Sequence, residues 1–127
     1  MSVFLFTDDL ETLEEKGTLL IVVPAGHDDK RRLLTWYAEA LRFPFHFGGN
    51  WDALSDCLSD LSWIAEKGIL IAHRDIPLAT EPAARSIYLD ILANAARSWE
   101  KDAARSFAVA FPPRTRRFDV WPSIDRL

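Results

Sequence analysis

The sequence predicts an α/β fold in which a three-stranded parallel sheet is covered by helices. Three apolar runs, Thr18–Val23, Gly68–His73 and Ser106–Phe111, are short, partly β-branched or aromatic, and do not alternate with polar residues. Strands that are buried on both faces have this composition. Helical patterns separate the runs, and an alternation of strands and helices favours parallel strands joined by right-handed crossovers.

Two helices are expected between the first and the second run. One covers residues 28–41, with Asp28 or Asp29 as its N-cap. The other follows Asn50, whose side chain can accept a hydrogen bond from the amides of the first turn. The apolar residues of the first helix recur at helical spacing and consist of Leu33, Leu34, Tyr37 and Leu41.

A longer helix, over residues 81–102, is expected between the second and the third run. Thr80 can cap it, and Pro82 is tolerated in its first turn because the N–H group that proline lacks has no partner there. The apolar side chains at helical spacing form one stripe, which we expect to face the sheet. This stripe consists of Ile87, Ile91, Leu92, Ala95 and Trp99.

The chain is expected to form one domain with a core over about residues 18–111. Residues 1–17 and 112–127 then extend this core at its two ends. In the first extension, residues 3–6 can form a short strand, followed by a charged helix that ends at Gly17. No internal repeat or linker suggests a second domain.

The carboxyl-terminal tail begins at Pro112 and Pro113, which stop the third strand. It can fold back as an extra edge strand, anchored by Phe118 and Trp121. Arginines beside aromatic rings also leave nucleic-acid binding open as a function of the tail. Because the chain carries a net negative charge, the favoured interpretation is that these side chains pack over a sheet edge. The arginines concerned are Arg114, Arg116 and Arg117.

The composition indicates a soluble cytoplasmic protein without a cofactor or a metal ion. The 127 residues include 19 acidic and 15 basic side chains. The net charge of −4 argues against general affinity for nucleic acid, because phosphate binding needs a concentrated basic surface. Cys57 is the single cysteine, which excludes an intrachain disulfide. No signal peptide, transmembrane run, phosphate loop or nucleophile elbow is recognisable.

The segment after Asn50 carries the clearest functional signal. Asp52 gains about 0.3–1 kcal/mol from the helix dipole. Asp56 lies one turn further along, where it repels Asp52 by about 0.2–0.5 kcal/mol. Nothing nearby in the sequence offsets this cost, so we expect a cationic partner to do so. The helix expected after Asn50 has two faces. One is apolar, with Leu54, Cys57, Leu58 and Leu61, and the opposite one is polar, with Asp52, Ser55, Asp56 and Ser59.

The loop over residues 44–49 places aromatic rings beside two glycines, directly before these carboxylates. Glycine permits positive φ and a close approach of the backbone. Rigid loops with aromatic rings often form the centre of an interface. At least one of Phe43, Phe45 and Phe47 is instead expected to fill the core.

The stretch FPFHFGGNWDALSDCL resembles the central motif of the barstar family. Members of this family are intracellular inhibitors of secreted bacterial ribonucleases. The shared pattern is a proline- and aromatic-rich loop followed by G-x-N-x-D-A-L-x-D-C-L, without a gap. A weaker resemblance covers about residues 18–111 and implies a barstar-like sheet and helix order. It also implies a protein that performs no catalysis, and that binds a basic ribonuclease or related nuclease toxin as a monomer. The matching residues are Gly48, Asn50, Asp52, Ala53, Leu54, Asp56, Cys57 and Leu58.

The resemblance also implies roles for single residues. By this resemblance, Asp56 would be the central group that fills the nuclease active site, and Asp52 would bind next to it. His46 would pack on the catalytic histidine of the enzyme. Asn50 and Gly48 would contact the enzyme through their backbone groups. Ser55 and Ser59 complete the expected contact surface.

Some positions depart from the family pattern. Tryptophan stands in the prototype where this chain has Ser55, and tyrosine where it has His46. Threonine is replaced by Ser59, and another tryptophan of the contact region by Leu61. Asn94, on the long helix, aligns with an acidic contact residue.

A small enzyme or ligand-binding domain is the alternative function. His73, Arg74 and Asp75 follow the second strand at the carboxyl edge of the sheet, where open α/β sheets bind ligands. A histidine there could act as an acid or a base. The simpler interpretation is a solvent-exposed strand end. Cys57 is a poor nucleophile candidate, because its helix face points to the core.

Overall fold

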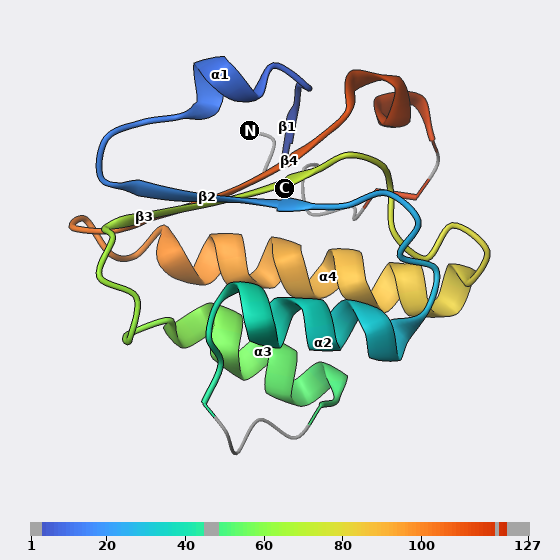
Figure 1. Ribbon diagram of the computed structural model, residues 1–127, viewed down its shortest axis with the longest axis horizontal. Coiled ribbons are helices and arrows are strands. Elements are labelled where there is room, and N and C mark those ends of the chain that lie inside the picture. The colour runs from blue at the N-terminus through green and yellow to red at the C-terminus, as the bar shows by residue number, and fades with distance from the viewer. Residues whose placement is uncertain (1–3, 45–48, 119, 122–127) are drawn as a thin grey trace.

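The computed structural model describes residues 4–44, 49–118 and 120–121. A parallel sheet with the strand order β1-β4-β3-β2 separates two unequal layers. Helices α2, α3 and α4 lie on one side of it, and the short α1 lies on the other (Figure 1). The strands are β1 (Phe4–Phe6), β2 (Thr18–Val23), β3 (Gly68–His73) and β4 (Ser106–Phe111); the helices are α1 (Leu10–Leu13), α2 (Lys30–Ala40), α3 (Trp51–Asp60), α4 (Pro82–Trp99) and the 3-10 helix η1 (Pro113–Arg117).

The three predicted strands are confirmed, and they pair in parallel as β2-β3-β4. The central strand β3 is buried at every position. Its first residue, Gly68, lies between hydroxyls of both neighbouring strands: a Cβ atom there would be 2.5 Å from Thr18 Oγ1 and 3.0 Å from Ser106 Oγ. A larger residue at this position would force the Thr18 side chain to move.

The sheet has four strands rather than the expected three, because β1 pairs in parallel with β4. The sheet edge beside β4 is therefore occupied by β1. The expectation that the tail adds an edge strand is wrong for the described residues. The tail forms η1 instead, and Trp121 packs edge-on against Phe4, Phe6 and Phe111. Trp121 is an anchor as predicted, whereas Phe118 is 43 % exposed and is not.

The connection from β1 to β2 crosses the sheet in the direction opposite to the connections that follow it. A right-handed crossover in that direction must pass over the other face of the sheet, which explains why α1 lies apart from the other helices. The helix ends at Leu13, not at Gly17 as expected, and the backbone at Glu14 is extended. Glu14 and Glu15 would have placed negative charge at the carboxyl end of a longer helix, where the dipole disfavours it.

The ends and faces of the remaining helices agree in part with the predictions. Asp29 is the N-cap of α2, and its carboxylate accepts a hydrogen bond from the Arg31 amide at 2.9 Å. Thr80 does not cap α4, which begins after Glu81 without a side-chain cap. The apolar stripe of α4 also differs by one position, because Ile87 is 43 % exposed while Tyr88 is fully buried.

Two apolar clusters result from these layers. The larger one lies between the sheet and α2, α3 and α4, and it includes Trp99, Tyr37 and Phe111. The smaller one lies on the opposite face, where Leu10 and Leu13 of α1 pack against the sheet. Within the described part of the chain, no helix has the length and apolar character needed to span a membrane.

Candidate partner-binding site

Helix α3 begins as the sequence predicts. Asn50 is the N-cap in extended conformation, and its side-chain oxygen accepts a hydrogen bond from the Ala53 amide at 2.7 Å. The next residue, Trp51, lies 6.4 Å from the Tyr88 ring of α4, and the Lys30 ammonium of α2 lies 5.2 Å from the centroid of the indole. The first turn of α3 is therefore fixed against both neighbouring helices.

The two faces of α3 are also those predicted. Leu54 and Leu58 are fully buried, and Leu61 behind the last turn is buried with them. On the opposite face, Asp52 and Asp56 are exposed. Ser59 is exposed and Ser55 half-buried on the same side, so short polar side chains surround the carboxylates.

No cation of the described residues pairs with these carboxylates. The one ion pair among the described residues joins Arg114 of η1 to Asp75, which lies just after β3. Burial and the neighbouring carboxylates of Asp56 and Asp60 raise the pKa of the Cys57 thiol. The carboxylates therefore act electrostatically on Cys57 within the same helix. Their negative charge is left for solvent or a partner to balance.

Asp60 extends the carboxylate row, and the sequence analysis missed it. It is exposed and lies four residues after Asp56, which itself lies four residues after Asp52. Residues at this spacing are neighbours on a helix surface, so the repeat of aspartates every fourth position was the signal that could have identified Asp60. The exposed face of α3 therefore carries three carboxylates, one in each turn.

The carboxyl end of α3 is held by Trp99, the last residue of α4, and by Arg105, which lies directly before β4. The Arg105 guanidinium donates to the backbone carbonyls of Asp60 at 3.3 Å and Leu61 at 2.9 Å. A cation at this end of a helix is favourable, and it binds the backbone rather than a carboxylate. Trp99 donates from Nε1 to the Leu58 carbonyl at 2.9 Å, and its ring stacks under Arg105 at 4.2 Å. These contacts fix α3 before any partner binds, which reduces the entropy lost on binding.

The other residues expected at the site have different outcomes. His46 and Gly48 lie outside the described residues. Phe43 is buried and packs edge-on against a tryptophan, so it fills the core. Leu61 is fully buried and contributes to the core rather than to a contact surface. Asn94 is exposed on α4 and borders a hollow of about 550 Å³ that is lined by other residues from the second half of α4 and the turn after it.

The alternative site at His73 is not accessible. The side chain is 3 % exposed and stacks on Phe111 with 4.0 Å between ring centroids. Its Nδ1 lies 2.9 Å from the Ala110 carbonyl, and its Nε2 lies 2.7 Å from the Tyr88 hydroxyl. Burial lowers the pKa of His73 to about 3. Both earlier interpretations, an exposed strand end and a surface acid or base, are therefore wrong.

The part of the chain that the structure describes contains no group of three His, Cys, Asp or Glu side chains placed to hold a metal ion. Asp52, Asp56 and Asp60 follow one another along the helix and do not converge on one point, so their geometry suits cationic side chains that approach from outside. A row of this kind matches a positively charged cleft.

A comparison with known families gives one match. The model described as Barstar (barnase inhibitor) matches residues 18–112. The matched span begins with β2, ends directly after β4, and includes α3 with its carboxylates. The comparisons with curated proteins and with solved structures each found no match.

Proposed function

The chain belongs to the barstar family, whose members are inhibitors rather than enzymes, and we propose that it binds and blocks the basic active site of a ribonuclease or a related nuclease toxin. The observation that supports this most directly is the exposed carboxylate row on α3, which has no cation of its own among the described residues. In this proposal the protein acts as an immunity protein in the cytoplasm of a bacterium that produces the nuclease.

The chemistry of the row suits such a target. A nuclease holds the phosphodiester of its substrate with arginine, lysine and histidine side chains, and a carboxylate can take the place of the phosphate oxygens. Arginine pairs with a carboxylate through two parallel hydrogen bonds, which gives direction as well as affinity. Asp56, in the middle of α3, is the central group in this proposal, and Asp52 and Asp60 lie on either side of it.

The polar groups around the carboxylates have supporting roles. Ser55 and Ser59 can donate or accept hydrogen bonds beside Asp56. His46, Gly48 and Asn50 would contact the partner from the start of the helix, as the resemblance implies. The small side chains of Ser55 and Ser59 allow the enzyme surface to approach the helix closely.

The size of an ordinary inhibitor interface sets a further requirement. Such interfaces bury about 800 Å² on each partner. Helix α3 has 10 residues and is therefore about 15 Å long, which covers only part of that area. The loop before α3 and the exposed sides of its neighbouring helices must supply the remainder. The net charge of −4 favours encounter with a basic enzyme and predicts slower association at higher salt.

An inhibition assay against small basic ribonucleases tests the proposal. The wild-type protein should inhibit a target at near-equimolar concentration, and Asp56→Ala should weaken inhibition by about a hundredfold or more, because the cations of the enzyme are left buried without a partner. Asp8→Ala is the matched control, since Asp8 is exposed and lies close to the start of α1, which is on the opposite side of the sheet from α3. If Asp56→Ala and Asp8→Ala inhibit equally well, the carboxylate row is not the binding site.

A further inference from the structure

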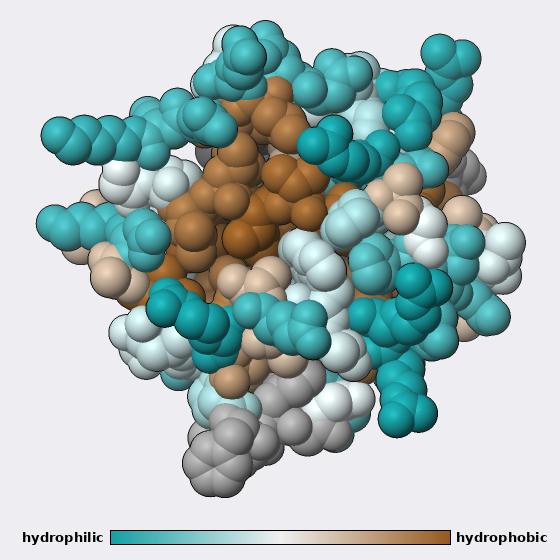
Figure 2. Space-filling model, viewed as in Figure 1, coloured by the Kyte–Doolittle hydropathy of each residue, from teal (hydrophilic) through white to brown (hydrophobic). Residues whose placement is uncertain are grey.

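Strand β2 forms a free edge of the sheet. It pairs with β3 on one side, and no described strand lies on its other side. It has 6 residues, TLLIVV, without a charge or a proline, whereas the other edge strand, β1, has only 3. Figure 1 shows β2 at the front of the sheet, and Figure 2 shows apolar side chains in the same place. An uncharged edge of this length is a template for pairing with another strand.

The backbone groups that β2 offers at this edge belong to Leu20 and Val22. The hydrogen bonds that β2 accepts from β3 and its flanks include those to the carbonyls of Gly17 and Val23. In a parallel pair, the residues that bond to one neighbour alternate along the strand. The odd-numbered residues of β2 therefore face β3, and the N–H and C=O groups of Leu20 and Val22 point out of the sheet.

The edge has no free donor at either end. The Thr18 amide donates to the Glu15 carbonyl of its own chain at 3.0 Å. Pro24 directly follows β2 and has no N–H group. The outward donors are therefore confined to the middle of the strand. The side chains of Leu20 and Val22 are partly exposed beside this edge, on the side of the sheet that carries α1.

We propose that the edge of β2 binds the same edge of a second copy of this chain, in an antiparallel two-fold dimer with one continuous sheet. With Ile21 on the two-fold axis, Leu20 of one copy lies opposite Val22 of the other. The two outward N–H groups of each copy then meet carbonyls of the other copy, and Thr18 lies opposite Pro24, neither of which has a free donor. The edge thus complements itself, and the contact closes after two copies. Such a dimer would take the place of the monomer that the resemblance implies.

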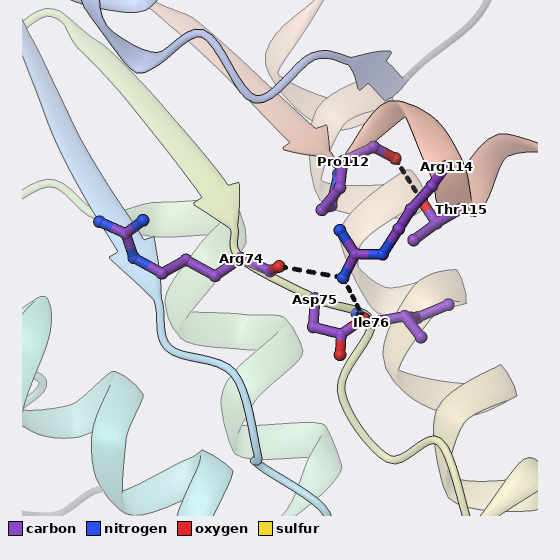
Figure 3. Close-up of polar contacts among 6 residues, drawn as sticks. All are labelled: Arg74, Asp75, Ile76, Pro112, Arg114 and Thr115. Atoms are coloured by element: carbon purple, nitrogen blue, oxygen red, sulfur yellow. Dashed lines mark hydrogen bonds and ion pairs between the residues drawn. The ribbon is translucent and has the colours of Figure 1, made fainter.

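Arg74 follows β3 and lies beside the carboxyl end of β2. It continues the alternation that places Leu70 and Ala72 on the side of the sheet with α1. Its backbone is held, because its amide donates to the Val23 carbonyl at 3.0 Å and its carbonyl accepts from Arg114 at 3.4 Å. Figure 3 shows the Arg74 guanidinium extending away from Arg114, and no carboxylate of the described residues pairs with it.

The amino end of β2 is acidic on the same side of the sheet. A hollow of about 390 Å³ at this end is lined by Glu14, Glu15, Lys16, Thr18 and Leu20. The antiparallel dimer brings the Arg74 guanidinium of each copy toward this hollow on the other copy, where two carboxylates outnumber one ammonium. The two contacts are equivalent by symmetry, and they should make the dimer sensitive to salt.

The contact is small, so the dimer should be weak. Six residues of a strand are roughly 20 Å long. A contact along one edge of this length is smaller than a standard interface, which buries about 800 Å² on each partner. We therefore expect the dimer at high protein concentration and the single chain at low concentration.

Sedimentation velocity of the full chain over a concentration series tests the proposal. The wild-type protein should form dimers reversibly. Leu20→Lys and Val22→Glu should each weaken dimerisation at least about tenfold, because a lone charge then faces an apolar side chain of the other copy. An equimolar mixture of the two variants should regain the dimer, because the introduced ammonium then lies directly opposite the introduced carboxylate.

The matched control is Ile87→Lys, which places the same charge on α4 at a side chain that is 43 % exposed and far from β2 in the chain. It should dimerise as the wild type does, and urea unfolding confirms that each variant is folded. A wild-type protein that remains monomeric at all concentrations overturns the proposal. Dimerisation of Leu20→Lys and Val22→Glu at the wild-type strength, or a mixture that stays monomeric, also overturns it.

Amide hydrogen exchange followed by NMR tests the register of the two strands. The amides of Leu20 and Val22 should exchange at least about tenfold more slowly in concentrated than in dilute wild-type protein, because they alone in β2 gain an acceptor. The Ile21 amide faces β3 and should exchange at the same rate in both samples. A dimer in which the Leu20 and Val22 amides gain no protection would show that the chains associate elsewhere.

Discussion

Acidification from about pH 7.5 to about pH 5 should lower the free energy of unfolding by about 2 kcal/mol through one residue, His73. The histidine is buried, and the Ala110 carbonyl can only accept a hydrogen bond, so Nδ1 carries the proton. Nε2 then accepts from the Tyr88 hydroxyl, which in turn accepts from the Tyr37 hydroxyl at 2.6 Å. This directed chain requires the neutral ring and links the sheet to α4 and α2.

The magnitude follows from the two pKa values. Burial lowers the pKa of His73 from 6.5 to about 3 in the folded protein, although the bond to the Ala110 carbonyl opposes the shift. Because the folded pKa is depressed, the unfolded chain binds the proton more readily. The stability is therefore complete above about pH 6.5 and is lost as the pH falls toward 3. The full difference has a ceiling of about 5 kcal/mol, of which about 2 kcal/mol is lost by pH 5.

Urea unfolding followed by tryptophan fluorescence measures this loss over a pH series. His73→Gln keeps a polar side chain at the position but removes the titrating group, so its stability should change by about 2 kcal/mol less than that of the wild type over the same range. Burial also lowers the pKa of His27, and that smaller contribution is common to both proteins. Parallel pH profiles for the wild type and His73→Gln would refute the reasoning.

Three further substitutions test how α3 is built. Asp56→Ala should raise the stability of the free protein by about 0.5–1 kcal/mol, since alanine is the better helix former and no longer repels Asp52; unchanged or lower stability in chemical denaturation would contradict the cost assigned to the carboxylates. Arg105→Ala should lower stability by about 1–2 kcal/mol, because it removes the donor to the last carbonyls of α3; a melting temperature equal to the wild type would show that these bonds contribute nothing. Trp99→Phe should lower stability by about 1–3 kcal/mol by leaving the Leu58 carbonyl unpaired, and calorimetric unfolding that shows no loss would refute that role.

The features that could be predicted from the sequence have local causes. The strands β2, β3 and β4 are short apolar runs, and Pro24 and Pro112 directly follow β2 and β4, so the composition of these strands and the ends of two of them are visible in the chain. Helix α3 has an N-cap with a free side-chain oxygen and a strict separation of apolar and acidic residues. Asn50 and Asp56 could therefore be placed correctly before the fold was known.

The features that could not be predicted depend on residues far apart in the chain. The pairing of β1 with β4 joins segments near opposite ends, and a short run such as Phe4–Phe6 does not indicate its neighbour. His73 is neutral and buried because Tyr88 and the Ala110 carbonyl accommodate it, and neither is near it in the sequence. The same holds for Arg105, which caps a helix that ends more than 40 residues earlier.

The most direct test of the central claim is the affinity of Asp56→Asn for a ribonuclease that the wild-type protein inhibits, measured by calorimetry at low and at high salt. Asparagine keeps the shape of the side chain and removes its charge. If cations of the enzyme complete the carboxylate row, Asp56→Asn should bind about a hundredfold more weakly and lose part of the salt dependence, while Asp8→Asn binds as the wild type does. Equal affinity of Asp56→Asn and the wild type at both salt concentrations would contradict the account.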